Sequence, residues 1–247
     1  MTLDVLAIAA HPDDAELGVG GTLMALAAAG YAVGVLDLTD GEPTPRGDPA
    51  TRAREAEAAT RLLGLDFRHR LDLPNRALAD TPEARVAVAE VLRETQPQVV
   101  LAHHPDDAHP DHVAAAAICA AARFSAKMSR TGWRGERWYP PRLYGFHVNH
   151  ARVQAPVTFV VDITAVYDRK LAAIACYASQ GTQDGSIDAA RDWMHVETRA
   201  RHYGALAGVR YGEAFHSPEP LVVDRLPGSL LPARRPDVLP EPAPRDR

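Results

Sequence analysis

Hydrophobic and polar positions in this chain follow two alternating periodicities. Short apolar runs rich in branched residues predict buried β-strands, and longer stretches with apolar positions every three or four residues predict amphipathic helices. The strand-like runs cover residues 5–9, 32–38, 67–71, 99–103, 142–147 and 157–163, and the helical patterns include residues 22–29, 49–63, 83–94 and 111–124. Because strands and helices alternate, the sequence predicts an α/β fold with a mostly parallel open sheet and helices on both faces.

The order of these runs also predicts where a site would form. In an open parallel sheet, ligands bind beyond the carboxyl ends of the strands, at the point where the strand order reverses. In the usual doubly wound order, the first and fourth strands are neighbours at that point. The loops that follow residues 5–9 and 99–103 should therefore meet, although about 100 residues separate them in the sequence.

Length and composition indicate one globular domain. The chain has 247 residues, of which 46% are hydrophobic and 24% are charged, and we expect a single domain over residues 1–231. Residues 232–247 are rich in Pro, Arg and Asp and predict a disordered tail. Residues 123–141 break the periodicity and predict a long loop over or beside the site, either a lid or an oligomer contact.

Charge and hydropathy exclude several classes of partner. A net charge of -5 and a pI near 6.1 provide no field that would attract nucleic acid or an anionic membrane. The start of the chain lacks a basic segment followed by an apolar stretch, and no run approaches the roughly 20 apolar residues of a membrane span. We therefore expect a cytoplasmic protein. The two cysteines, Cys119 and Cys176, form no zinc pattern and are expected to be small buried hydrophobes.

Two short acidic histidine motifs carry the candidate chemistry. Each follows an apolar run and is expected just beyond the end of a buried strand; the motifs are His11-Pro12-Asp13-Asp14 and His109-Pro110-Asp111-His112. One such loop alone is as typical of a turn or a helix N-cap as of a functional site. Two of them with complementary side chains favour a catalytic divalent metal site.

Three of these side chains meet the requirement of a hydrolytic metal site, which takes three protein ligands and keeps one position open for water. They are His11, Asp14 and His112. Two imidazoles and one carboxylate suit Zn²⁺, and the same set binds Fe²⁺ or another first-row metal, so the metal stays open. Asp13 diverges from its neighbour Asp14 and is free to act as the general base.

The remaining motif residues form a second pair. A carboxylate beside an imidazole holds the ring in one orientation and favours its protonated form. Asp111 is thus expected to support His109, which would stabilise an oxyanion or hand a proton to a leaving group. His103 and His104 are open between support of the ligands and simple burial at a strand end.

Three other interpretations compete with metal-assisted hydrolysis. Gly18, Gly20 and Gly21, with Asp37 after the second strand, could indicate dinucleotide binding, but the glycines come late and follow three acidic residues. An Fe²⁺ oxygenase also uses two histidines and a carboxylate, yet it needs no base such as Asp13. A non-catalytic metal-binding or assembly module would instead show a closed four-ligand site.

The motifs resemble the PIG-L/LmbE-like family of metal-dependent N-acetylglucosaminyl deacetylases over nearly the whole chain. The resemblance is carried by residues 10–18 (AHPDDAELG), 20–23 (GGTL) and 109–112 (HPDH). Residues 73–76 (LPNR), 107–112 (DAHPDH), 176–180 (CYASQ) and 213–215 (EAF) look most like the branch that deacetylates N-acetylglucosaminyl-malate in bacillithiol biosynthesis. Other N-acylated sugar conjugates stay open as substrates.

The resemblance implies a Rossmann-like fold and a role for each matching residue. His11, Asp14 and His112 would bind zinc, Asp13 would be the general base, and His109 would handle the oxyanion and the proton with support from Asp111.

Two residues would bind substrate, namely Arg52 and Asn75. Asn75 stands where the family commonly has Asp. Without the resemblance, Arg52 would be interpreted as a solvated helix arginine. The branch often forms hexamers, so a homo-oligomer is implied.

Overall fold

A seven-stranded sheet forms the centre of the computed structural model, which describes residues 1–45, 47–148, 156–181 and 194–221. The strand order is β3-β2-β1-β4-β5-β7-β6. The strands are β1 (Val5–Ala9), β2 (Val33–Asp37), β3 (Phe67–Arg70), β4 (Val99–His103), β5 (Arg142–Phe146), β6 (Phe159–Asp162) and β7 (Gly212–His216). The predicted tail over residues 232–247 lies outside the described residues.

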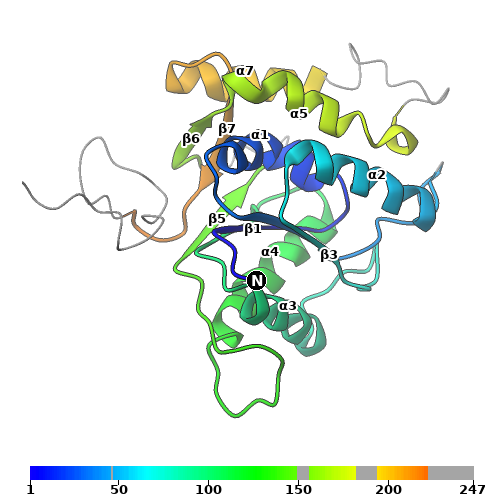
Figure 1. Cartoon of the computed structure of the whole chain (residues 1–247), viewed down its shortest axis with the longest axis vertical. Helices are drawn as coiled ribbons and strands as arrows, with labels where there is room; N and C mark the ends of the chain where they lie inside the picture. Colours follow the sequence, from blue (N-terminus) through cyan, green and yellow to red (C-terminus); the bar gives the residue numbers. More distant parts are fainter. Residues whose placement is uncertain (46, 149–155, 182–193, 222–247) are drawn as a thin grey trace, which may run out of the picture.

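Helices cover both faces of this sheet, as the sequence predicts (Figure 1). One face carries α3 (Pro82–Thr95) and α4 (Pro110–Ser125), and the other carries α1 (Asp14–Ala28), α2 (Pro49–Leu63) and α5 (Tyr167–Ile174), with α7 (Met194–Ala207) packed on β7. Two short 3-10 turns follow β6 and α5, η1 (Thr164–Val166) and η2 (Ala178–Gln180). The predicted α/β fold with a mostly parallel open sheet is confirmed.

The reversal of strand order falls between β1 and β4, where the sequence predicts it. Val5 pairs with Val99 and Ala7 pairs with Leu101 in parallel register. Both strands are fully buried because helices cover both faces, which explains their continuous apolar runs. The two motif loops therefore leave the same edge of the sheet side by side.

The first helix begins earlier than its apolar pattern indicates. The pattern predicts a helix from residue 22, whereas α1 begins at Asp14 and contains the glycines. A Cβ atom on Gly18 would lie 2.5 Å from Cδ2 of Phe146, and one on Gly21 would lie 2.7 Å from Cγ2 of Ile163. The glycines thus allow α1 to pack closely on β5 and on the segment after β6. They form no phosphate-binding turn, so the dinucleotide interpretation is wrong.

The end of the sheet beyond β5 differs from the predicted parallel pattern. β7 runs antiparallel to both of its neighbours, β5 and β6. β7 was not among the predicted strands, because its apolar pattern is short and weak. Among the described helices, none is long and apolar enough to cross a membrane.

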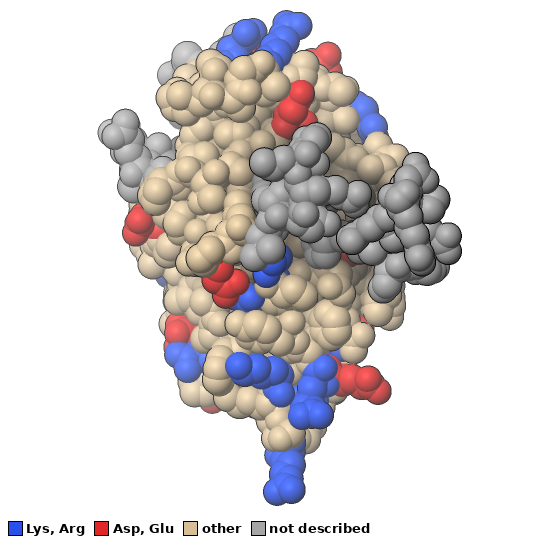
Figure 2. Space-filling model, turned by 90° about the vertical axis from the view of Figure 1, so that its left-hand side faces the viewer, with Lys and Arg blue, Asp and Glu red and all other residues tan. Residues whose placement is uncertain are grey.

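The loop between α4 and β5 lies at the amino ends of the strands, away from the motif loops. Arg93 donates to the carbonyl of Gly135 (3.0 Å), and Trp138 donates to the carbonyl of Pro97 (2.8 Å), both beside the end of α3. The interpretation of residues 123–141 as a lid is therefore wrong. Figure 2 shows Lys and Arg side chains gathered at the end of the molecule where this loop projects; its exposed basic residues are Lys127, Arg130, Arg134 and Arg137.

Candidate metal centre

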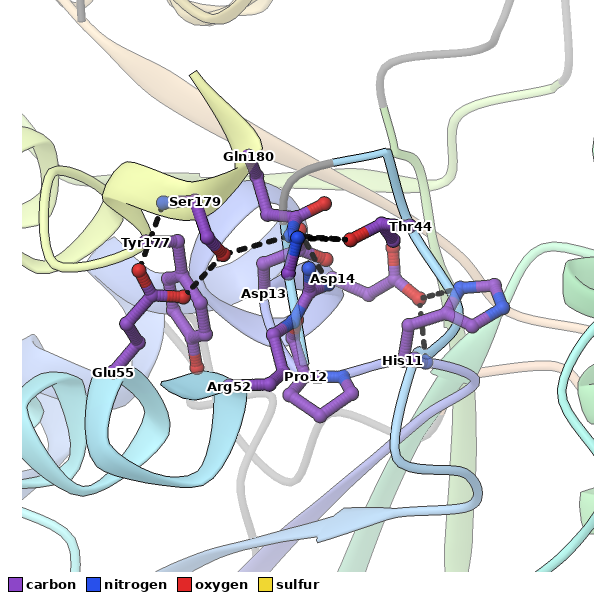
Figure 3. Close-up of polar contacts among 12 residues, drawn as sticks. His11, Pro12, Asp13, Asp14, Thr44, Arg52, Glu55, Tyr177, Ser179 and Gln180 are labelled. Atoms are coloured by element: carbon purple, nitrogen blue, oxygen red, sulfur yellow. Dashed lines mark hydrogen bonds and ion pairs between the residues drawn. The ribbon is translucent and has the colours of Figure 1, made fainter. Parts of the chain in front are cut away.

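The structure brings together the three side chains that the sequence nominates as ligands. One ligand atom each from His11, Asp14 and His112 lies within 4.8 Å of the other two. Nδ1 of His11 is 3.2 Å from Oδ2 of Asp14, and Nε2 of His112 is 3.3 Å from its Oδ1 (Figure 3 draws the His11 side). All three are at most 9% exposed. A buried donor set of two imidazoles and one carboxylate fits a divalent transition metal.

Electrostatics in this cluster favour a cation between the ligands. Burial alone would raise the pKa of Asp14, but His112, His103 and His11 hold it well below its usual value. Burial alone would lower the pKa of His112, but Asp14 and Asp107 raise it to about 10. The carboxylates of Asp14 and Asp107 thus favour positive charge at this point. A bound metal ion would supply that charge in place of the protons on the imidazoles.

Asp13 adopts a backbone conformation that few residues other than glycine tolerate. Its φ is 124° directly before the start of α1. Such strain persists only where the surroundings enforce it, and it is concentrated at functional sites. The strained turn directs the carboxylate of Asp13 toward Arg52 rather than into the first turn of the helix (Figure 3). Burial raises the pKa of Asp13 to about 7 against the opposing effect of Arg52.

Arg52 is a buried residue of the site, so the interpretation of a solvated helix arginine is wrong. Its side chain is 3% exposed. It donates from Nη2 to Oδ2 of Asp13 (2.9 Å) and from Nε to the carbonyl of Pro12 (2.8 Å). Its guanidinium lies 5.5 Å from the ring centroid of Tyr177. Nη1 is buried and has no hydrogen-bond partner among the described residues, which leaves one donor for a ligand.

His109 caps the second motif helix with its ring. Nδ1 accepts a hydrogen bond from the backbone N–H of Asp111 (3.2 Å), so the proton of a neutral ring is on Nε2. Burial and the neighbouring imidazoles of His112 and His11 lower the pKa of His109. This direction is opposite to the expectation from the sequence, because these effects outweigh the charge of Asp111. His109 is arranged as a neutral hydrogen-bond donor.

Asp111 lies between the first motif and the loop after β3. Its carboxylate is 3.1 Å from Nε2 of His11 and accepts from the backbone N–H groups of Arg76 (2.8 Å) and Leu78 (3.3 Å). Asn75 precedes Arg76 in this turn, and its Oδ1 is buried without a hydrogen-bond partner among the described residues. Asp111 therefore anchors the turn that follows Asn75, and the sugar contact of Asn75 stays a prediction.

Two further groups surround the ligands: His103, whose role the sequence left open, and Asp107, which sequence reasoning missed as a contact of a ligand. Asp107 lies 3.1 Å from Nδ1 of His112. His103 accepts from the backbone N–H of Ala10 (2.9 Å) and stacks on His112, and burial lowers its pKa to about 4, so its ring is neutral. The position of His103 as the last residue of a buried strand was the available signal for the support role. Asp107 gave none, because its place in a loop is typical of a solvated carboxylate.

A buried ionic network fixes the start of α1 through Glu16. Arg68 donates to Asp37 (2.8 Å) and to Glu16 (2.7 Å). Tyr177 donates from its hydroxyl to the same oxygen of Glu16 (3.0 Å). Asp37 is thus occupied by Arg68 and is unavailable to a ribose. The network holds η2 beside Arg52, where Ser179 donates to Glu55 (2.7 Å; Figure 3).

A groove with a volume of about 640 Å³ begins at this corner of the site. It runs from Pro12 and Arg52 between α2 and the open edge of β3. Two of its cations, Arg52 and Arg68, are already paired with carboxylates. The volume is in the range of small-molecule sites, so the groove is large enough for the part of a substrate that extends beyond the reacting group.

Comparison with known proteins identifies relatives along most of the chain. Residues 6–123 match the family described as PIG-L, GlcNAc-PI de-N-acetylase. The chain is 29% identical to a diacetylchitobiose deacetylase of Thermococcus kodakarensis over 85% of this chain and 80% of that protein. It is 31% identical to a 1D-myo-inositol 2-acetamido-2-deoxy-alpha-D-glucopyranoside deacetylase of Saccharopolyspora erythraea, over 81% and 92%.

Two further matches concern the fold and the chemistry found among similar chains. The crystal structure of a conserved protein from Thermus thermophilus superposes with a TM-score of 0.81 at 39% identity, over 90% of this chain and 97% of that chain. A 4-oxalmesaconate hydratase of Pseudomonas putida is 34% identical over 71% of this chain and 73% of that protein. Similar chains therefore include both deacetylases and a hydratase.

Proposed function

The chain belongs to the PIG-L/LmbE-like family, and from that membership and the geometry of the site we propose that it removes the acetyl group from an N-acetylglucosamine conjugate by metal-assisted hydrolysis. The observation that carries the proposal is the position of Asp13. Its carboxylate is held by Arg52 at 2.9 Å, directly before Asp14 in the ligand cluster. Metal-assisted amide hydrolysis needs a base that accepts the proton of the attacking water, close to the metal that activates the water and the carbonyl.

His11, Asp14 and His112 would hold the metal, with Zn²⁺ as the proposed ion and Fe²⁺ as the alternative. A divalent ion at this point polarises the acetamide carbonyl and lowers the pKa of a water molecule. Asp13 accepts the proton of the attacking water. Arg52 donates to that carboxylate and to the adjacent carbonyl of Pro12. The base is therefore already in position, and little entropy is lost in placing it during the reaction.

His109 acts on the opposite part of the reacting amide. Its Nε2–H donates to the oxygen on which negative charge develops, because Nδ1 already accepts from the backbone of Asp111. A donor fixed by a backbone contact needs no reorganisation when the charge appears. The proton that Asp13 took from the water then passes to the departing nitrogen as the C–N bond breaks, which leaves acetate and a free amino sugar as products.

The conjugated group of the sugar is the finer part of the proposal. The branch motifs support N-acetylglucosaminyl-malate in bacillithiol biosynthesis, with the buried Nη1 of Arg52 as the donor to a carboxylate or hydroxyl. The named relatives support a second N-acetylglucosamine or an inositol. Arg52 and Arg68 of the groove are already paired with carboxylates, which also favours a neutral group attached to the sugar. Assembly as a homo-oligomer stays a prediction from the resemblance.

Acetate release from a panel of conjugates tests this proposal. The panel contains N-acetylglucosaminyl-malate, diacetylchitobiose, the inositol conjugate and free N-acetylglucosamine, each with chelator-treated enzyme and with enzyme reloaded with Zn²⁺ or Fe²⁺. We expect metal-dependent acetate release and a clear preference for one conjugate. If no acetate appears with either metal, while 4-oxalmesaconate is hydrated, the protein shares the chemistry of its hydratase relative instead.

A further inference from the structure

Asp107 contacts the ring nitrogen of His112 that does not face Asp14. Its Oδ2 is 3.1 Å from Nδ1 of His112, whereas Nε2 of the same ring is 3.3 Å from Oδ1 of Asp14. The His112 and Asp107 side chains are 1% and 2% exposed, so water does not compete for this contact. A carboxylate, an imidazole and a ligand carboxylate thus form one buried row.

We propose that Asp107 is a positioning residue of the metal site, which orients His112 and strengthens its binding to the ion. This inference rests on the metal binding proposed above. A carboxylate that accepts Nδ1–H leaves the lone pair on Nε2 and raises the basicity of that nitrogen. Because Nε2 of His112 faces Asp14, the contact of Nδ1 with Asp107 favours the tautomer that can bind a metal.

Asp107 also has a local role that a test must separate from the proposed one. Its Oδ1 accepts a hydrogen bond from the backbone N–H of His109 (2.8 Å), which closes the turn before α4. Substitution by Ala would remove both interactions. An Asn residue keeps an oxygen for the turn and loses the negative charge against His112, so Asp107→Asn isolates the proposed role.

The neighbouring Asp106 provides a matched control. It is one residue away in the same loop and carries the same charge, but its side chain is exposed. Its backbone N–H donates to Nδ1 of His104, a contact that Asp106→Asn leaves intact. Any general effect of removing a negative charge near the site would therefore appear equally in Asp106→Asn.

The test is the dissociation constant of Zn²⁺, measured by competition with a chromogenic chelator, for the full chain and for both variants. We expect Asp107→Asn to bind zinc about 10- to 100-fold more weakly, the range known for lost carboxylate partners of ligand histidines, and Asp106→Asn to stay within about twofold. The far-ultraviolet circular dichroism spectrum of the metal-free protein should be the same in all three, since the turn is retained.

A second readout follows the ligand directly. The visible absorption spectrum of the Co²⁺-loaded protein should change in Asp107→Asn, because the orientation of His112 is no longer fixed, and stay unchanged in Asp106→Asn. Equal zinc affinity and an unchanged cobalt spectrum in Asp107→Asn would overturn the proposal. Because neither measurement uses a substrate, a failure of the proposed deacetylase activity would leave this result readable.

Discussion

The two His-Pro-Asp loops have the same first three residue types but fold differently. In the first loop, the helix begins at the fourth residue, Asp14, whereas in the second loop it begins at the second residue, Pro110. Asp13 therefore lies outside its helix, and Asp111 lies in the first turn of its own. The same His-Pro-Asp motif thus places its two aspartates in different backbone environments.

This difference assigns different chemistry to the two carboxylates. Asp13 is held in a strained turn and pairs with a side-chain partner, the guanidinium of Arg52. Asp111 accepts from the backbone N–H groups of Arg76 and Leu78, which anchor a neighbouring loop. The start of the helix, rather than the motif itself, decides which carboxylate is placed to accept a proton.

The fourth residues of the two loops converge instead of diverging. Asp14 and His112 both lie in the first turn of a helix, and their side chains meet at 3.3 Å. The loops leave neighbouring strands at the same edge of the sheet, so equivalent positions point to a common centre. The comparison therefore predicts that Asp14 and His112, the fourth residues, share the role of metal ligand. It also predicts that Asp13 and Asp111, the third residues, have different roles.

The largest expected effect is at the fourth position. Asp14→Ala and His112→Ala should each reduce bound metal well below one ion per chain, as should His11→Ala. Loss of a Lewis acid worth several kcal/mol should lower turnover about a thousandfold or more. Elemental analysis measures the metal, and Cys119→Ser in the core should leave it unchanged. Full metal content in any of the three Ala variants would remove that residue from the ligand set.

Unequal roles at the third position predict the next effect. Asp13→Asn should keep the metal and lower turnover by roughly two to four orders of magnitude, because the proton acceptor is lost. Asp111→Asn keeps an oxygen for one of the two backbone donors, which bind different carboxylate oxygens, and should cost only about tenfold because Asp111 is no proton acceptor. The check is kcat at saturating substrate together with metal content. Similar losses in the two variants would mean that the helix start does not separate their roles.

Arg52 sharpens the account of the first loop. Arg52→Ala removes the partner of Asp13 and also the Nη1 donor proposed for the malate carboxylate. The specificity constant should therefore fall by a factor equivalent to about 2–4 kcal/mol for N-acetylglucosaminyl-malate and by less for free N-acetylglucosamine. Arg54→Ala, an exposed arginine of the same helix, is the control and should have little effect. Equal losses for the two substrates would show instead that Arg52 acts only through Asp13 and does not bind the substrate carboxylate.

The sequence by itself determined the sheet and the meeting of the two loops. Buried strands and amphipathic helices have local periodicities, and six of the seven strands and α2, α3 and α4 lie within a few residues of their predicted ranges. Because a doubly wound sheet usually places its first and fourth strands side by side, the neighbours β1 and β4 were also predictable. The ligand cluster followed from that adjacency.

Only the tertiary structure decided which charges face one another. Arg52 and Asp13 are 39 residues apart, and Arg68 contacts Glu16 across 52 residues. No local pattern encodes such pairs, because an arginine on a helix and an aspartate in a loop are both typical of solvent. Packing removes them from water, and a buried charge is then stable only beside an opposite one or a hydrogen-bond partner. The arrangement of helices over the sheet therefore selected the partners of Asp13 and His112, while the sequence pattern placed only the backbone that carries them.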